Sequence, residues 1–496
     1  MTELAAARGA TEPQAGESQF VKALTLTDAT MLVAGSMIGS GIFIVSSDIA
    51  RTVGSPFWLI MAWVITGVMT LLGALAYGEL AAMYPRAGGQ YVFLRESMGP
   101  LVGFLYGWTL FVVIQTGTIA AVAVAFGRFL GVLWPDITPE RFGWFPAIDV
   151  ATPGGTIELG LSPQRLIALI SIWILTWINL RGVREGKLVQ TSFTIVKTGA
   201  LALLILLGLT IGRNATALEA NFGPGRFVGD VDVTGLFVIA FGAALVGSLF
   251  SSDAWNNVTF AAAEVKEPRR NLPRALAMGT GLVTVLYILA NFSYLNVLPF
   301  AGTADGATVL DRGIQHATQD RVGTAAAEVI FGPIGATLMA IAILISTFGC
   351  NNGLILAGAR VYWAMARDKL FFQRAGQLNQ HRVPAVALVV QAVWTSALCL
   401  TGTYGQLLDY VIFAALIFYA LTTVGLFILR SKRPDIDRPY RAVGYPVLPA
   451  LYVALASAVA LILLIADKTR AQAVSGLALV LLGIPVYYLW RRATRA

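Results

Sequence analysis

A series of apolar blocks, each about 20 residues long or longer, constrains this chain more than any other feature. A block of that length crosses a hydrocarbon core of roughly 30 Å as a helix. Hydrophobic residues make up 57% of the sequence and charged residues 12%, whereas soluble domains carry about 25% charged residues. Because so few charges cannot cover a water-exposed surface, we expect the lipid bilayer to surround the fold.

The blocks predict an all-α polytopic membrane protein with twelve spanning helices and both termini on one side. Residues 1–26 are polar and are expected to form a cytoplasmic tail. They do not resemble a cleaved signal, because the first apolar block is too long and too rich in glycine. The predicted spans are residues 27–50, 57–83, 97–131, 163–182, 189–212, 235–262, 274–298, 328–364, 384–402, 406–430, 444–466 and 471–490.

The net charge of +8 reports topology, because the basic residues lie in short loops and form no basic domain. Most of them fall in or beside cytoplasmic loops when the N-terminus is placed inside, as the positive-inside rule requires. We therefore expect no nucleic-acid partner. The long outer loops, residues 132–162 and 299–327, are expected to cover gates or the surface.

The residue types in the spans argue against an enzyme. His316 and His381 fall in loops, Cys350 and Cys399 lie apart in apolar spans, and no metal-ligating or catalytic cluster is apparent. We expect no metal and no cofactor. No polar stretch is long enough for an appended domain, so function is expected within the membrane bundle.

The composition of the first and sixth predicted spans predicts a break in each helix. Residues 35–43, GSMIGSGIF, place three glycines and two serines in mid-span, where a continuous helix favours Ala, Leu or Ile. Residues 247–255, GSLFSSDAW, add Asp253, and a charge at the bilayer centre costs about 2.5–3.5 kcal/mol. Close packing of small residues is the alternative for the first span, but it does not explain Asp253.

Broken helices at corresponding positions of two halves indicate the central site of a transporter. Half-helix N-termini bind a carboxylate and freed carbonyls bind an ammonium group, which suits a zwitterion. We predict two inverted repeats of five helices, residues 27–212 and 235–430. Two further helices and a short tail follow in residues 444–496.

Several motifs resemble the L-type amino-acid transporter family of the amino acid–polyamine–organocation superfamily. Residues 39–43, GSGIF, match its first-helix motif, and residues 250–276, FSSDAWNNVTFAAAEVKEPRRNLPRAL, are similar to its sixth helix and following loop. Further matches lie at residues 84–91, 348–367, 433–439 and 483–487, so the resemblance spans nearly the whole chain. It implies the fold of the sodium-coupled leucine transporter and sodium-independent exchange of amino acids.

The resemblance also implies a substrate site. Amides around Ser40 and Gly41 would hold the substrate carboxylate, carbonyls near Met37, Phe250 and Asp253 would hold its amine, and the Phe250 ring would form the outer gate. The predicted substrate-binding residues are Met37, Ile38, Gly39, Ser40, Gly41, Phe250, Ser251, Ser252 and Asp253.

Lys197 lies about eight residues inside the fifth span, roughly 12 Å deep at 1.5 Å per residue. Snorkelling of its long side chain is one explanation. The resemblance supplies another, because relatives carry a lysine here whose ammonium replaces the second sodium ion between helices one and eight. A buried lysine can also release and rebind a proton, so proton symport shares this residue with exchange.

Three acidic residues have open interpretations. Asp253 either caps the broken helix and attracts the amine, or meets a cationic side chain, as in some relatives that accept basic amino acids. Neutral substrates are favoured because no other acidic residue is placed near the site. Glu79 and Glu264, near Arg86 and Lys266 at the cytoplasmic side, are expected to be interfacial charges, with pairing across an inner gate as the alternative.

Animal members of the family carry a cysteine between helices three and four that bonds a glycoprotein subunit. Residues 132–162 contain none, so we predict no disulfide-linked heavy subunit and a bacterial inner membrane location. Exchange of neutral L-amino acids is the predicted function. Proton-coupled symport, exchange of cationic amino acids, and sensing without flux remain the alternatives.

Overall fold

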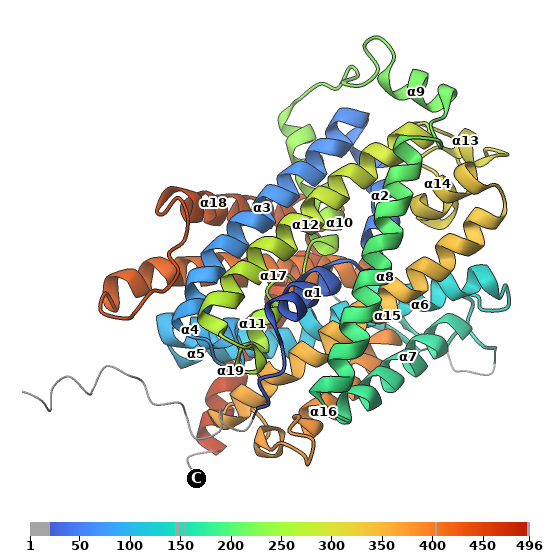
Figure 1. Cartoon of the computed structure of the whole chain (residues 1–496). Helices are drawn as coiled ribbons and strands as arrows, with labels where there is room; N and C mark the ends of the chain where they lie inside the picture. The colour runs from blue at the N-terminus through green and yellow to red at the C-terminus, as the bar shows by residue number, and fades with distance from the viewer. Residues whose placement is uncertain (1–19, 144–147, 153–154, 402–403, 494–496) are drawn as a thin grey trace, which may run out of the picture.

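The computed structural model describes residues 20–143, 148–152, 155–401 and 404–493 (Figure 1). Nine continuous helices in this part of the chain are long and apolar enough to cross a membrane. The shorter α10 (Gly235–Ser251) and α16 (Ala385–Cys399) and an interrupted first span complete the predicted twelve crossings, so the polytopic helical class is confirmed. The long crossings are α3 (Pro56–Met83), α5 (Pro100–Thr109) continued through η4 (Leu110–Ile114) and α6 (Gln115–Leu133), α7 (Pro163–Leu180), α8 (Val183–Leu209), α12 (Pro268–Val297), α15 (Ile334–Arg367), α17 (Tyr404–Lys432), α18 (Val447–Ile465) and α19 (Arg470–Ala493).

Both predicted helix breaks are present. The first span consists of α1 (Leu26–Met37), a single 3₁₀ turn, η3 (Gly41–Phe43), and α2 (Ser46–Val53). Its break begins at Ile38, whose ψ of 90° leaves the helical region. The sixth span consists of α10, the short α11 (Asn257–Phe260) and η5 (Ala262–Glu264), and Ala254 between them has a left-handed φ of 63°.

Equivalent elements of the two halves pack against each other. α3 lies against α12, α6 against α15, α7 against α16, and α2 and η3 against α10. A two-fold axis relating the halves brings elements close to it together in this way, so the packing supports the inverted-repeat arrangement. The repeat boundaries at residues 27–212 and 235–430 remain predictions. α1 lies in the middle of the bundle, in contact with α8, α12 and α15 (Figure 1).

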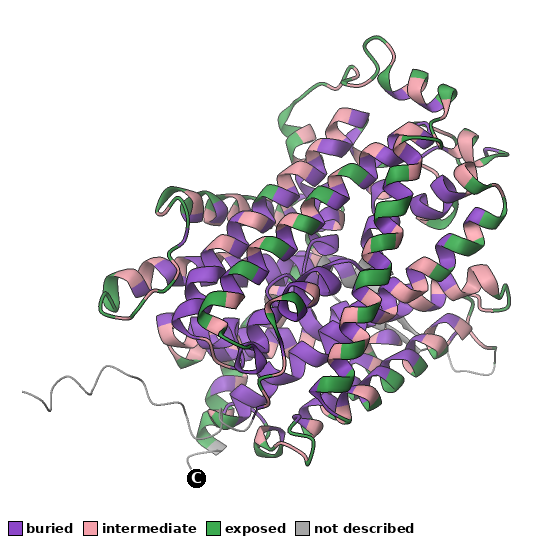
Figure 2. Cartoon of the chain, viewed as in Figure 1, coloured by how far each residue is buried: buried purple, intermediate pink, exposed green. Residues whose placement is uncertain are grey.

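The distribution of apolar residues is the one expected in a bilayer. α8 exposes Leu188, Ile195, Leu203 and Leu206 on its outer face, while its Lys197 is buried (Figure 2). An apolar outer face is stable in lipid, and polar groups then turn inward to find partners. The interior of this bundle is consequently where chemistry is expected.

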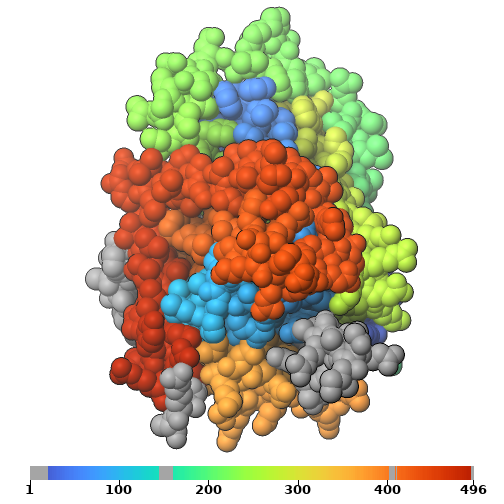
Figure 3. Space-filling view, turned by 90° about the vertical axis from the view of Figure 1, so that its left-hand side faces the viewer, coloured from blue at the N-terminus to red at the C-terminus, as the bar shows by residue number. Residues whose placement is uncertain are grey.

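The final helices cover one side of the bundle. α17 packs against α4 (Gln90–Met98), and α19 packs against α5 (Figure 3). The indole Nε1 of Trp108 donates to the carbonyl of Leu479 at 3.0 Å, which fixes α19 on α5. Gly99, with a φ of 98°, separates α4 from α5, so the third crossing begins at Pro100, three residues later than predicted.

The long connections contain secondary structure that their composition did not predict. The connection between α6 and α7 carries an antiparallel hairpin of β1 (Ile148–Thr152) and β2 (Gly155–Leu159), with Ile148 opposite Leu159. This hairpin departs from a strictly all-helical chain. The remaining short elements are α9 (Ala215–Phe222), α13 (Val309–Arg312), η6 (Thr318–Asp320), α14 (Val322–Phe331) and η7 (Gln373–Gly376).

The expectation that Glu79 and Glu264 are interfacial charges is wrong, because both are fully buried. Glu79 pairs with Arg430 at 2.6 Å, and Glu264 pairs with Arg360 at 2.9 Å. These partners come from α17 and α15, far away along the chain. The basic residues nearest in sequence, Arg86 and Lys266, therefore did not predict the ion-pair partners of Glu79 and Glu264. The pair Glu264–Arg360 joins the end of the broken sixth span to α15.

We expect Arg360→Met to lower the free energy of unfolding by about 3–5 kcal/mol, because Glu264 would stay buried without its partner. Arg269→Met is the matched control, since Arg269 pairs with Asp437 on the surface, where such pairs contribute about 0–1 kcal/mol. Thermal unfolding of the purified proteins in one detergent measures both. Equal shifts in the two variants would contradict a structural role for the buried pair.

Candidate functional site

The two helix breaks meet at the centre of the bundle. Gly41 opens η3 directly against the end of α10, where a Cβ atom on Gly41 would lie 2.1 Å from the Oγ of Ser251. Only glycine allows this close approach. Gly35 lies against α8 in the same way, because a Cβ there would lie 2.2 Å from Thr194. The predicted glycine-rich segment is therefore required by packing as well as by the break.

A small central cavity lies at this meeting point, bounded by α1, η3, α6, α10 and α15. Two of the predicted substrate-binding residues are not in its lining: Ile38 is buried beside it, and Ser252 lines a neighbouring cavity. The predicted residues that line it are Met37, Gly39, Ser40, Gly41, Phe250, Ser251 and Asp253. The lining residues that the sequence did not indicate are Ser36, Thr118, Val122, Ala254 and Cys350.

The ends of the half-helices give the central cavity a polar character. α1 and α10 both end at it with their carbonyl ends, which favour cations, and η3 begins at it with its amide end. The hydroxyl of Tyr287 donates to the carbonyls of Met37 at 3.0 Å and Ser251 at 3.1 Å. The Phe250 carbonyl accepts the Asp253 amide at 3.1 Å. The Met37 and Ser251 carbonyls each have a second lone pair that can accept an ammonium group.

Lys197 of α8 donates hydrogen bonds to the backbone carbonyls of the first helix break. Its Nζ donates to the carbonyls of Gly35 at 2.5 Å, Ile38 at 2.6 Å and Ser346 at 3.3 Å. The side chain is 1% exposed, so snorkelling toward a membrane surface does not describe it. Its ammonium lies between α1 and α15 and is surrounded by backbone oxygens, which are also the ligands that a small cation takes in a protein.

Asp253 borders the central cavity and two further cavities beside it. It is buried, and its Oδ1 accepts a hydrogen bond from the Tyr419 hydroxyl at 2.5 Å. Within the described residues no basic side chain forms an ion pair with it. It does not cap α11, whose N-cap residue is Asn256. A buried carboxylate in this position favours a donor or a cation from the substrate.

The N-side, defined as the side where α1 begins, is closed below the cavity. Lys187 of α8 pairs with Asp28 of α1 at 2.6 Å and donates to the Ala23 carbonyl at 3.1 Å. The Leu24 amide donates to the Glu264 carbonyl at 2.9 Å, which ties the start of α1 to the broken sixth span. These contacts cross between elements that must separate if the cavity is to open on this side.

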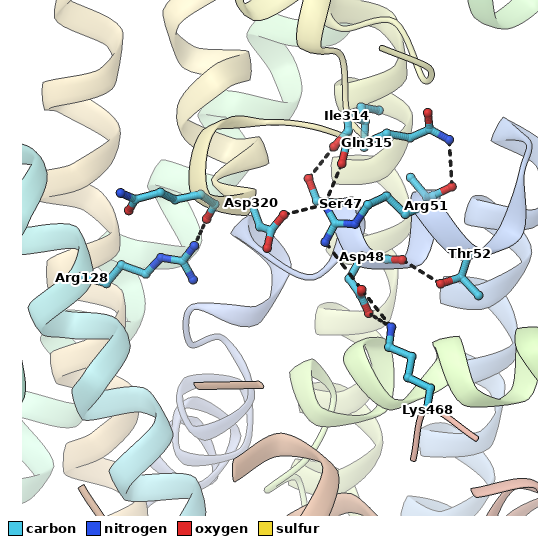
Figure 4. Close-up of polar contacts among 11 residues, drawn as sticks. Ser47, Asp48, Arg51, Thr52, Arg128, Ile314, Gln315, Asp320 and Lys468 are labelled. Atoms are coloured by element: carbon cyan, nitrogen blue, oxygen red, sulfur yellow. Dashed lines mark hydrogen bonds and ion pairs between the residues drawn. The ribbon is translucent and has the colours of Figure 1, made fainter. Parts of the chain in front are cut away.

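The opposite side is closed by a polar cluster around α2 (Figure 4). Arg51 donates to the Gln315 carbonyl and to Asp320, both at 2.7 Å, and Lys468 pairs with Asp48 at 2.8 Å. The residues that line the cavity are all buried, and Phe250 is only 6% exposed. Buried lining residues with polar contacts on both sides are the arrangement expected when both gates of a carrier are closed.

Tyr287, Ser346 and Tyr419 contact the site, yet the sequence analysis did not identify them. Tyr287 belongs to a polar stripe on α12 with Asn291 and Tyr294, spaced four and three residues apart, so the three share one helix face. Asn291 accepts from Ser46, and Tyr294 donates to the Ile42 carbonyl. A polar stripe of this kind in an apolar span could have identified these site residues from the sequence.

Two interrupted helices that meet in a closed, polar, central cavity define a membrane carrier that works by alternating access. The comparison with known sequences agrees with this class. The chain belongs to the amino acid permease family, whose profile matches residues 24–486. It is thus a multi-pass membrane protein of a family that transports small molecules.

Relatives are similar over almost the whole chain. The large neutral amino acids transporter small subunit 2 of Mus musculus is 31% identical over 94% of this chain and 81% of its own length. The serine/threonine exchanger of Bacillus subtilis (strain 168) is 31% identical over 94% of this chain and 96% of its own length. The b(0,+)-type amino acid transporter 1 of Mus musculus is 27% identical over 95% and 88%.

We expect Tyr287→Phe to weaken substrate binding roughly tenfold, because two carbonyls at the breaks lose a shared donor and each hydrogen bond contributes about 1 kcal/mol. Tyr488→Phe is the control, since Tyr488 is 53% exposed on α19. Equilibrium binding of a labelled amino acid to purified protein measures the effect. Unchanged binding in Tyr287→Phe would show that the breaks hold their geometry without this hydroxyl.

Proposed function

We propose that the protein is a sodium-independent exchanger of neutral L-amino acids that works by alternating access. The observation that carries this proposal is the Lys197 ammonium, bound by the carbonyls of Gly35, Ile38 and Ser346. The resemblance to the L-type family implies that this covalently fixed cation takes the place of a sodium ion at the break. The first half-helix is then held in place without sodium.

The substrate binds across the two breaks in this proposal. Its carboxylate meets the amide end of η3 at Ser40 and Gly41, where the helix dipole favours a negative charge. Its ammonium meets the carbonyl ends of α1 and α10 at Met37 and Phe250, with Asp253 close by. The Phe250 ring closes the cavity toward the side of α2, so that a bound zwitterion is enclosed before the opposite gate opens.

Two relatives are named as transporters of neutral amino acids, one for large neutral amino acids and one for serine and threonine. This supports a neutral substrate and exchange. Exchange of cationic amino acids is the second candidate, because Asp253 is buried without an ion-pair partner in the described part of the chain. Catalysis is not part of either proposal.

The remaining proposals concern the surroundings of the protein. The N-side is assigned to the cytoplasm, with both termini inside, on the distribution of basic residues. Residues 1–19, most of the predicted tail, lie outside the described residues. We assign the chain to a bacterial inner membrane and propose no disulfide-linked subunit, since its two cysteines, Cys350 and Cys399, are both buried.

The test is uptake of a labelled amino-acid panel into proteoliposomes, with and without internal amino acid, sodium and a pH gradient. We expect uptake that requires internal amino acid and ignores sodium. Lys197→Met should reduce it at least tenfold, because three buried carbonyls lose their partner. Lys432→Met is the control, since Lys432 is exposed at the end of α17.

Other outcomes of the same experiment would replace the proposal. Uptake into empty vesicles that follows an inward proton gradient indicates a symporter. A preference for lysine and arginine indicates the cationic exchanger. Binding without flux indicates a sensor. Full activity of Lys197→Met would remove the physical basis for sodium independence.

A further inference from the structure

Three arginines gather where α7 meets α8 on the N-side, close to Lys187. Arg181 is the C-cap residue of α7, Arg184 lies in the first turn of α8, and Arg382 lies in the loop that precedes α16. We name these three residues the arginine patch. All of them are exposed, and no acidic side chain in the described part of the chain forms an ion pair with them. The patch is consequently a local excess of positive charge.

The two loops that carry the patch are joined by direct contacts, although they lie far apart along the chain. α7 packs against both α8 and α16 (Figure 1). The Nδ2 of Asn379 donates to the Leu180 carbonyl at 3.0 Å, and the Asn379 carbonyl accepts the amide of Arg382 at 2.9 Å. A Cβ atom on Gly182, whose φ is 141°, would lie 3.9 Å from the Cβ of His381. The fold therefore brings these arginines together and holds their backbone in place.

An aromatic ring orients one of the arginines. The Arg181 guanidinium carbon lies 3.7 Å from the ring centroid of Trp177, one helical turn earlier on α7. Such a stack holds the planar guanidinium, whose fork of donors matches the oxygens of a phosphate group. Trp177 is itself 53% exposed, and tryptophan is enriched at the level of lipid headgroups. The patch thus has the chemistry of a phosphate site at the edge of the bilayer.

Exposed apolar stripes lead away from the patch along both helices. On α8, Leu188 and Ile195 are 69% and 59% exposed and share one helix face with Arg184. On α7, the exposed apolar residues that share a face with Arg181 are Leu166, Ile170, Trp173, Ile174 and Trp177. Side chains of this kind are stable against acyl chains. A ligand with an anionic head and apolar tails matches the patch and the stripes together.

We propose that the arginine patch binds the headgroup of an anionic phospholipid, whose acyl chains lie along the exposed stripes of α7 and α8. Basic pockets between membrane helices bind such headgroups through their charge. A soluble phosphate matches the arginines equally well, but it makes no use of the adjoining stripes. The general excess of basic residues on one side of a membrane protein requires only their number. It does not require two distant loops to bring unpaired arginines together beside an exposed tryptophan.

The test is native mass spectrometry of the purified full chain, which counts the lipid molecules that each protein molecule retains. Phosphatidylglycerol and phosphatidylcholine with identical acyl chains are added separately at equal concentrations. We expect at least tenfold higher apparent affinity for phosphatidylglycerol, because each arginine near a membrane contributes roughly fivefold toward an anionic lipid. Equal retention of the two lipids by the wild-type protein would overturn the proposal without recourse to any variant.

A combined variant tests whether the patch is the site. Replacing Arg181, Arg184 and Arg382 by glutamine should lower the affinity for phosphatidylglycerol to that for phosphatidylcholine. The matched control removes the same charge from three other exposed N-side arginines, in α12 and in the loop before α18: Arg274→Gln, Arg433→Gln and Arg441→Gln. It should keep the preference for phosphatidylglycerol. An equal loss in both variants would show that net charge attracts the lipid, and it would overturn the assignment to the patch.

Two further outcomes separate the lipid from other occupants. Displacement of phosphatidylglycerol by glycerol 3-phosphate at comparable concentrations would assign the patch to a soluble phosphate and overturn the lipid assignment. A protein dimer that retains no lipid and disappears in the patch variant would assign this face to a second copy of the chain. Because no transport is measured, the result does not depend on the exchanger function proposed above.

Discussion

The carbonyl oxygens freed at the two helix breaks impose the constraint on which the rest of the structure depends. No water is available in the hydrocarbon core, so each carbonyl that leaves a helix must find a donor in the protein. Lys197 donates to the carbonyls of Gly35 and Ile38. Tyr287 donates to those of Met37 and Ser251. Ser346 donates to that of Gly39. These donors come from α8, α12 and α15, so the packing of three crossings fixes the position of the breaks.

The use of a lysine for this purpose has consequences for energetics. A bound sodium ion can leave, and its return down a concentration gradient can drive uptake. An ammonium group attached to α8 cannot leave, so it stabilises the break without coupling transport to a sodium gradient. Uptake against a concentration gradient must then be coupled to another solute, and exchange of one amino acid for another is one such coupling. In the proposed function, the fixed charge at Lys197 would link the broken helix to the mode of transport.

Sequence reasoning recovered the features that are local in the chain. Apolar blocks predicted the crossings, and the segments at residues 35–43 and 247–255 predicted the breaks, because glycine, serine and a lone carboxylate conflict with a lipid-facing helix. It failed where distant segments meet. The partners of Glu79 and Glu264 lie on α17 and α15, and the hairpin of β1 and β2 depends on pairing that the loop's Gly, Pro and Thr content does not reveal.

The ion pairs on the two sides of the cavity differ in how far they are exposed, and this difference bears on the transport cycle. On the N-side, Lys187 is 30% exposed and its partner Asp28 is 9% exposed, whereas on the opposite side Arg51 and Asp320 are about a third exposed. Exposed pairs contribute little and are screened by salt. A buried pair sits in a low-dielectric environment, and separating it requires both charges to be rehydrated or paired again. Asp28 is the most buried of these charged groups, so we expect opening of the N-side to cost more than opening on the side of α2 and to be the slower half of the cycle. In an exchanger, interactions with the bound amino acid must offset the higher cost of opening the N-side. A carrier without substrate would then change sides slowly, and substrate inside the vesicle would accelerate uptake.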